Sequence, residues 1–148
     1  MKNKFLPTTY FIISLIIVCI FNFLIPTYEI IPNYYNYSGV LLIIIGIVLN
    51  IWSDQLFKKN KTTIKPFEES NKLVIKGPYV ISRNPIYLGF VIIVLGLTIF
   101  FKDFLPLIIP LILFIILDNL FVKEEEKMLV NTFGKDYKNY QEKVGKWL

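Results

Sequence analysis

The chain has 148 residues, of which 55% are hydrophobic, 16% aromatic and 18% charged, and it carries a net charge of +5. It contains no histidine and a single cysteine, Cys19. These counts exclude a Ser-His-Asp triad, a zinc site with histidine ligands and a disulfide within the chain. The length is that of one domain, 1–148. Its apolar residues gather in long uncharged blocks, which indicates an integral membrane protein.

Four apolar blocks are candidate membrane spans. They cover about residues 5–25, 38–57, 86–101 and 104–122. A helix needs roughly 20 apolar residues to cross a bilayer core. Lipid offers no hydrogen-bond partners to the backbone, so only helices and closed barrels, which satisfy their own backbone groups, can span it. We predict an all-α polytopic membrane protein with about four transmembrane helices. The third block is short, and together with the fourth it predicts a helical hairpin.

Basic residues indicate how the chain is oriented. Lys2 and Lys4 precede the first block, whereas the loop 26–37 contains no Lys or Arg. The loop after Phe57 and the tail after Val122 are rich in lysine. Because cytoplasmic loops carry the excess of Lys and Arg, both termini and the long loop are predicted to be cytoplasmic. Basic charge placed in this way suits anionic lipid headgroups better than nucleic acid, so no nucleic-acid partner is expected.

Beyond the fourth block the pattern changes. Met128, Leu129, Phe133, Tyr137 and Tyr140 recur at helical spacing among charged residues. This spacing predicts an amphipathic helix over about 123–143, or two short helices broken at Gly134, lying along the cytoplasmic interface.

The segment 77–89 is the first place where chemistry could occur. Gly77 and Pro78 favour a turn, and Pro85 can open a helix, so Arg83 and Asn84 are expected where cytoplasm meets bilayer. A purely structural interpretation is also open. In it, Arg83 is an interfacial anchor, the tyrosines belong to an aromatic belt and Gly89 is a helix-packing position.

Two further groups of polar residues allow both a structural and a functional interpretation. The acidic run Glu124–Glu126 is either the solvated first turn of a helix or a set of acceptors for ribose hydroxyls and ammonium groups. Polar residues also lie near the ends of the predicted spans, where they either form interhelical hydrogen bonds or line a functional cavity. The members of this last group are Asn50, Asp54, Asp118 and Asn119.

Taken together, these segments resemble a known family. Residues 77–89 are similar to the GPY…R(H/N)PxYxG signature of the isoprenylcysteine carboxyl methyltransferase family, which is related to the phospholipid N-methyltransferases. Residues 125–144 resemble that family's EExxL…FGxxYxxYxxxV tail. The stretch 62–68, TTIKPFE, is similar to one found in small prokaryotic members, which points to a prokaryotic cell membrane. The resemblance extends from about Ile51 to the C-terminus.

The resemblance implies S-adenosylmethionine-dependent methyl transfer to a lipophilic acceptor at the cytoplasmic membrane face. Carried over by position, the cofactor contacts fall on Asn71, Lys72, Leu73, Val74, Tyr79, Asn84, Pro85, Ile86, Tyr87 and Glu125, with Glu126 in support. Arg83 and Asn84 would act in orientation, and Asp118 and Asn119 would lie near the acceptor. No metal is expected. The working hypothesis is that the loop entering the third helix and the acidic start of the tail meet over a shared cavity.

The sequence departs from the family pattern in ways that concern the acceptor. Asn84 stands where many members have histidine, and Gly145 replaces a common proline. No arginine lies in 117–122, where the prenylcysteine enzymes carry one implicated in acceptor binding. A prenylcysteine-like carboxylate or another lipidic acceptor is therefore left open. The alternatives are an NADPH-dependent membrane reductase of lipids or sterols, and a lipid-binding membrane protein without enzymatic activity.

Overall fold

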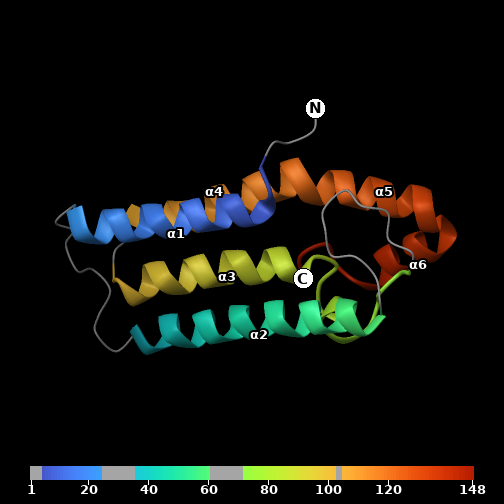
Figure 1. Ribbon diagram of the computed structural model, residues 1–148, viewed down its shortest axis with the longest axis horizontal. Helices are drawn as coiled ribbons and strands as arrows, with labels where there is room; N and C mark the ends of the chain where they lie inside the picture. The colour runs from blue at the N-terminus through green and yellow to red at the C-terminus, as the bar shows by residue number, and fades with distance from the viewer. Residues whose placement is uncertain (1–4, 25–35, 61–71, 103–104) are drawn as a thin grey trace.

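The computed structural model describes residues 5–24, 36–60, 72–102 and 105–148. Over these residues the chain is helical, without strands, as predicted (Figure 1). The principal helices are α1 (Pro7–Leu24), α2 (Asn36–Asn60), α3 (Pro85–Phe100), α4 (Ile108–Leu117), α5 (Lys123–Phe133) and α6 (Lys135–Lys143). Short segments join them: the 3-10 turns η2 (Gly77–Val80) and η3 (Leu105–Leu107), and the π-helical turn η4 (Asp118–Val122).

Helices α1 to α4 run side by side, and α3 lies between α2 and the pair α1 and α4 (Figure 1). Glycines allow α2 and α3 to approach closely. A Cβ at Gly46 would lie 2.7 Å from the Gly89 carbonyl oxygen, and one at Gly96 would lie 2.6 Å from the Gly39 carbonyl oxygen. Small residues at such contacts are typical of helices that pack within membranes, where van der Waals contact replaces the hydrophobic effect.

Three of the helices are long and apolar enough to cross a membrane: α1, α2 and the continuous helix Leu105–Phe133. The fourth apolar helix, α3, has 16 residues and a length of about 24 Å, less than the roughly 30 Å of a hydrocarbon core. Large apolar side chains are exposed along α1 and α2, such as Ile16 and Val48. This surface suits lipid, and the protein is an integral membrane protein.

Helix α5 continues α4 through η4 without a chain turn, although the composition changes at Val122. The chain reverses only at Gly134, which has φ +55° and ψ −119°, a conformation accessible essentially to glycine. The predicted amphipathic segment is thus two helices broken at Gly134. Helix α5 projects from the end of the bundle where α2 ends and α3 begins, and α6 folds back from its tip (Figure 1). Its placement along a membrane interface stays a prediction.

Two clusters of buried residues hold these parts together. The first joins α1, α3, α4 and η4, and includes Val94, Leu113 and Phe121. The second attaches α6 to the loop before α3 through Val74, Tyr79, Tyr137 and Tyr140. The Tyr140 hydroxyl donates a hydrogen bond of 2.5 Å to the Tyr79 carbonyl oxygen. One end of the bundle therefore gathers the loop before α3, the start of α5, α6 and the C-terminal segment.

Candidate functional site

The loop entering α3 is shaped by a few local residues. Gly77 has φ +61°, which favours glycine, and Pro78 opens the 3-10 turn η2. Pro85 is the first residue of α3, where its missing N–H costs nothing, and Asn84 occupies the N-cap position without a side-chain hydrogen bond to the helix. The Asn84 backbone N–H donates to the Ser82 hydroxyl at 3.1 Å. The loop thereby places successive polar side chains at the mouth of α3.

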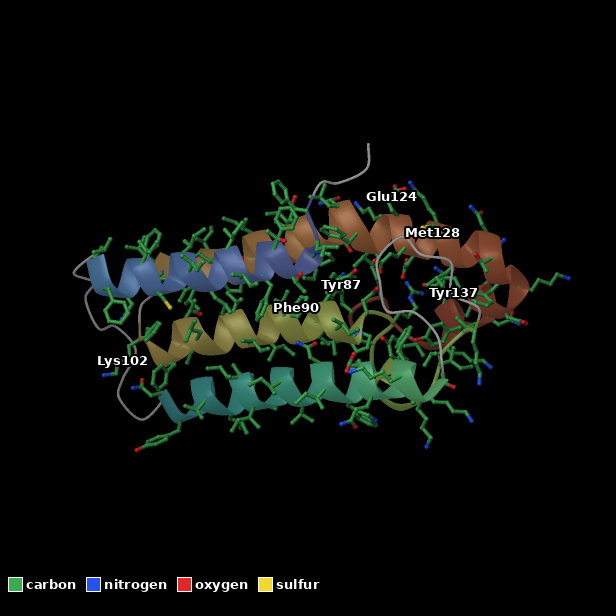
Figure 2. The ribbon with its side chains drawn as sticks, in the orientation of Figure 1. Tyr87, Phe90, Lys102, Glu124, Met128 and Tyr137 are labelled. Carbon is green, nitrogen blue, oxygen red and sulfur yellow. The ribbon has the colours of Figure 1, made fainter. Side chains whose placement is uncertain are left out.

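Tyr87 and Glu125 meet at the centre of this end of the bundle. The Tyr87 hydroxyl donates to Glu125 Oε1 at 2.5 Å, and the tyrosine is only 7% exposed. In Figure 2, Tyr87 lies between the helices, whereas Glu124 points away from the bundle. The start of α3 and the acidic start of α5 are therefore in direct contact. The cavity predicted between them stays a prediction.

Tyr79 extends this buried polar group. Burial above all, with smaller contributions from Tyr140 and Glu125, raises the pKa of the Tyr79 hydroxyl far above its ordinary value, and a hydrogen bond with Ser53 opposes the shift. The hydroxyl is therefore neutral at physiological pH. Phe57 lies alongside, with ring centroids 5.4 Å apart. Hydroxyls, one carboxylate and aromatic faces are thus collected beside the end of α2.

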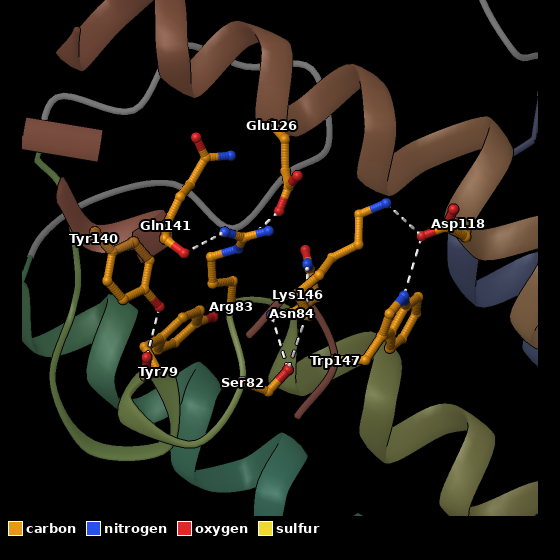
Figure 3. Close-up of polar contacts among 10 residues, drawn as sticks. All are labelled: Tyr79, Ser82, Arg83, Asn84, Asp118, Glu126, Tyr140, Gln141, Lys146 and Trp147. Carbon is orange, nitrogen blue, oxygen red and sulfur yellow. Dashed lines mark hydrogen bonds and ion pairs between the residues drawn. The ribbon is translucent and has the colours of Figure 1, made fainter. Parts of the chain in front are cut away.

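Arg83 connects the loop to α5, α6 and the C-terminal segment (Figure 3). Its Nε lies 2.9 Å from Glu126 Oε1, with side-chain exposures of 11% and 14%. Its Nη1 donates to the Gln141 carbonyl oxygen at 3.2 Å, and its backbone N–H donates to that of Gly145 at 3.1 Å. Arg83 and Glu126 are thus engaged with each other. The orienting role predicted for Arg83 toward a ligand stays a prediction.

The other residues predicted to contact the cofactor are mostly packed within the loop before α3 and the first turn of α3. Asn84 is buried, and its Nδ2 donates to the Lys146 carbonyl oxygen at 3.0 Å. Pro85 is buried, and Ile86 packs against the first cluster. Val74 is buried against Tyr79, with Leu73 packed beside it, whereas Lys72 is exposed. Asn71 lies outside the described residues.

Asp118 and Asn119, predicted near the acceptor, lie in the π-helical turn η4. Asp118 Oδ1 accepts from Lys146 Nζ at 2.8 Å and from Trp147 Nε1 at 3.0 Å, while Oδ2 is 3.7 Å from Lys123 Nζ. The exposed Asn119 accepts from Lys123 at 2.6 Å. Asp118 is therefore occupied by the C-terminal segment. Sequence reasoning missed Lys146 and Trp147; the one available signal was that an acidic residue at the end of an apolar block needs a partner.

The remaining polar residues of α2 differ in their surroundings. Asp54 pairs with Lys58 on its own helix at 2.5 Å. Asn50 Oδ1 is buried and has no hydrogen-bond partner among the described residues. It faces Gly89, where an added Cβ would lie 2.4 Å away. Asn50 is therefore an unsatisfied polar group at the interface between α2 and α3.

An open depression of about 510 Å³ lies beside the Arg83–Glu126 pair. Residues of α5 line most of it, and α6 contributes one residue. The lining residues are Lys123, Glu126, Lys127, Val130 and Asn131 of α5 and Gln141 of α6. Neither Tyr87 nor Glu125 lines it. Within the described ranges, no group of three or more acidic or cysteine side chains is arranged to hold a metal ion.

These features define an integral membrane protein with a buried polar site at one end of a helical bundle. The sequence matches the phospholipid methyltransferase family over residues 35–136, more than half of the chain. The chain therefore belongs to the phospholipid methyltransferase family. The match contains Arg83, Tyr87, Asp118, Glu125 and Glu126, and it ends before most of α6. It supports this related family, and does not single out the isoprenylcysteine carboxyl methyltransferases. Comparisons with curated proteins and with solved structures found no match.

Proposed function

We propose that the protein transfers a methyl group from S-adenosylmethionine to a lipophilic acceptor, at the end of the bundle where α3 begins. Membership of the phospholipid methyltransferase family supports the reaction class. The contact between Tyr87 and Glu125 supports this location of the cofactor site, because it joins the two sequence segments expected to hold the cofactor.

The chemistry of the buried residues fits this cofactor. S-adenosylmethionine presents ribose hydroxyls and an ammonium group, which need acceptors, and an adenine ring, which needs an apolar or aromatic face. Glu125 supplies a partly buried carboxylate, Tyr79 and Phe57 supply aromatic surface, and Asn50 Oδ1 is an acceptor without a partner among the described residues. The Tyr87 hydroxyl donates to Glu125 in the structure, and a ribose hydroxyl of the cofactor could donate a hydrogen bond to the same carboxylate. We assign the cofactor to Tyr79, Asn84, Tyr87 and Glu125, with Glu126 holding α5 in place through Arg83.

When bound, the cofactor supplies an electrophilic methyl group. The chain's own contribution is to align donor and acceptor and to exclude water, effects that contribute substantially to such displacements. Tyr79 and Tyr87 are each 7% exposed, so the site is already shielded. A lipid acceptor enters from the bilayer, with either a headgroup amine or a prenylcysteine-like carboxylate as the methylated group. The basic residues Lys58 and Lys59 lie at the same end of the bundle as the proposed site. Their charge favours a cytoplasmic location for that end.

Calorimetry on detergent-purified protein tests the cofactor site. S-adenosylhomocysteine should bind the wild type, and Glu125→Ala should weaken that binding at least tenfold. Glu124→Ala is the matched control, because its carboxylate lies on the surface, where it pairs with Lys127 at 2.7 Å and is 54% exposed. Equal affinity in both variants would remove Glu125 from the site. Tight binding of NADPH without binding of S-adenosylhomocysteine would favour the reductase instead.

The acceptor is identified in a separate assay. Protein in nanodiscs is supplied with S-adenosylmethionine labelled in its methyl group, and either with phosphatidylethanolamine or with farnesylcysteine. Label in the first lipid would identify a headgroup amine, and label in the second a carboxylate. Label in neither, with intact S-adenosylhomocysteine binding, would contradict both acceptor classes.

A further inference from the structure

The C-terminal segment 144–148 lies across the site, between the loop before α3 and the end of α4 (Figure 3). Its backbone is held on the loop side. The Arg83 N–H donates to the Gly145 carbonyl oxygen at 3.1 Å, and Ser82 Oγ and Asn84 Nδ2 donate to that of Lys146 at 3.3 and 3.0 Å. Because the segment contributes only backbone carbonyls to these bonds, they fix its path whatever its side chains are.

On the α4 side the segment is held by side chains alone. Lys146 Nζ and Trp147 Nε1 both donate to the same oxygen of Asp118. A carboxylate at the end of an apolar helix is costly unless it is paired. Asp118 also begins the π-helical turn η4, and such turns occur frequently at functional positions. One carboxylate thus holds two side chains, and the loop-side bonds do not depend on it.

The Trp147 indole lies at the edge of the cluster that contains Tyr87. Its ring centroid is 4.5 Å from that of Phe114 on α4, and it packs against the buried cluster of α1, α3 and α4. Tyr87 and Phe121 belong to this cluster, with centroids 6.3 Å apart. Trp147 therefore packs on the α4 side of the cluster to which Tyr87 belongs.

We propose that Trp147 is a specificity-determining gate for the lipid acceptor, and that Asp118 holds this gate closed. The inference rests on the proposed function for the identity of the acceptor, a lipid with a long hydrocarbon chain. In the structure the gate is closed, with both bonds to Asp118 formed. Opening requires that the two bonds to Asp118 and the packing of the indole on Phe114 be released, while the segment stays attached to the loop through its backbone.

Quenching of tryptophan fluorescence by brominated acyl chains tests the gate without any methyl transfer. The chain has two tryptophans, so Trp52→Phe leaves Trp147 as the only reporter. This protein is reconstituted into phosphatidylcholine vesicles with and without acyl-brominated phosphatidylcholine. Asp118→Ala, which removes the acceptor of both bonds, should at least double the quenching of Trp147. Lys146→Met, which keeps the bond between Trp147 and Asp118, should give a smaller increase. Asp136→Ala is the matched control on the exposed surface of α6 and should give none.

Size-exclusion chromatography selects folded protein, and Lys146→Met decides the question if Asp118→Ala does not fold. Quenching equal to that of the parent in folded Asp118→Ala, or an equal rise in Asp136→Ala, would overturn the gate. The affinity for S-adenosylhomocysteine, measured in parallel, should change less than twofold in Asp118→Ala, since the gate acts on the acceptor side. If the Trp52→Phe parent does not bind S-adenosylhomocysteine, the result counts against the proposed function. The quenching measurement still tests the gate, because it does not depend on methyl transfer.

Discussion

Arg83 and Glu126 form an ion pair whose two members are almost withdrawn from solvent, with Nε 2.9 Å from Oε1. Glu126 follows Glu125 directly, so this pair fixes the start of α5 against the loop that leads to Tyr87. Burying one charge without its partner is far more costly than burying both.

Removing one member of the pair should therefore be worse than removing both. Arg83→Met or Glu126→Met alone should destabilise the docking of α5 and α6 by about 3–5 kcal/mol, because each leaves a buried charge uncompensated. The double variant should recover most of this loss. Hydrogen exchange of residues 135–148, followed by mass spectrometry, measures the docking. Additive losses in the double variant would show that the two charges do not depend on each other.

The contact between α2 and α3 should not tolerate a methyl group. Gly46→Ala and Gly96→Ala would place a Cβ 2.7 and 2.6 Å from a backbone oxygen of the facing helix. Backbone cannot move aside as a side chain can, so we expect a loss of about 1–3 kcal/mol from overpacking. Thermal unfolding in detergent measures the effect. Ile47→Ala is the control, since Ile47 is 43% exposed on α2. Unchanged unfolding temperatures for both glycine variants would contradict this packing.

The attachment of α6 should weaken in strongly alkaline solution. Burial, opposed by Arg83 and reinforced by Glu126, raises the pKa of Tyr140 to about 12. Its value in the unfolded chain is about 10. The folded protein thus holds this proton more tightly, so the stabilisation is complete below about pH 10 and is lost as the pH rises toward 12. The unfolding free energy measured across this range should fall less steeply in Tyr140→Phe. Identical slopes would show that Tyr140 does not contribute.

The sequence was sufficient to locate the four apolar helices and to bring the start of α3 together with the acidic start of α5. Uncharged blocks reveal helices directly, and a short hairpin must return the chain to the end from which it left. The break at Gly134 could also be expected, because glycine between two amphipathic stretches favours a reversal.

The docking of the C-terminal segment could not be predicted in the same way. Asp118 is separated from Lys146 by 28 positions and from Trp147 by 29, and no periodic pattern connects residues so far apart. The straight passage from α4 into α5 was equally hidden. A change from apolar to charged residues marks where the environment changes, and it does not require the helix axis to change with it.

Helices of unequal length serve one site here. The helix Leu105–Phe133 has 29 residues, about 43 Å, and α3 has 16, about 24 Å. Glu125 sits on the long one and Tyr87 on the short one. Thicker bilayers straighten a long tilted helix and strain a short one, at a modest energy per ångström of mismatch. We expect the hydrogen bond between Tyr87 and Glu125 to depend on the thickness of the surrounding lipid, because the two helices that carry it differ in length.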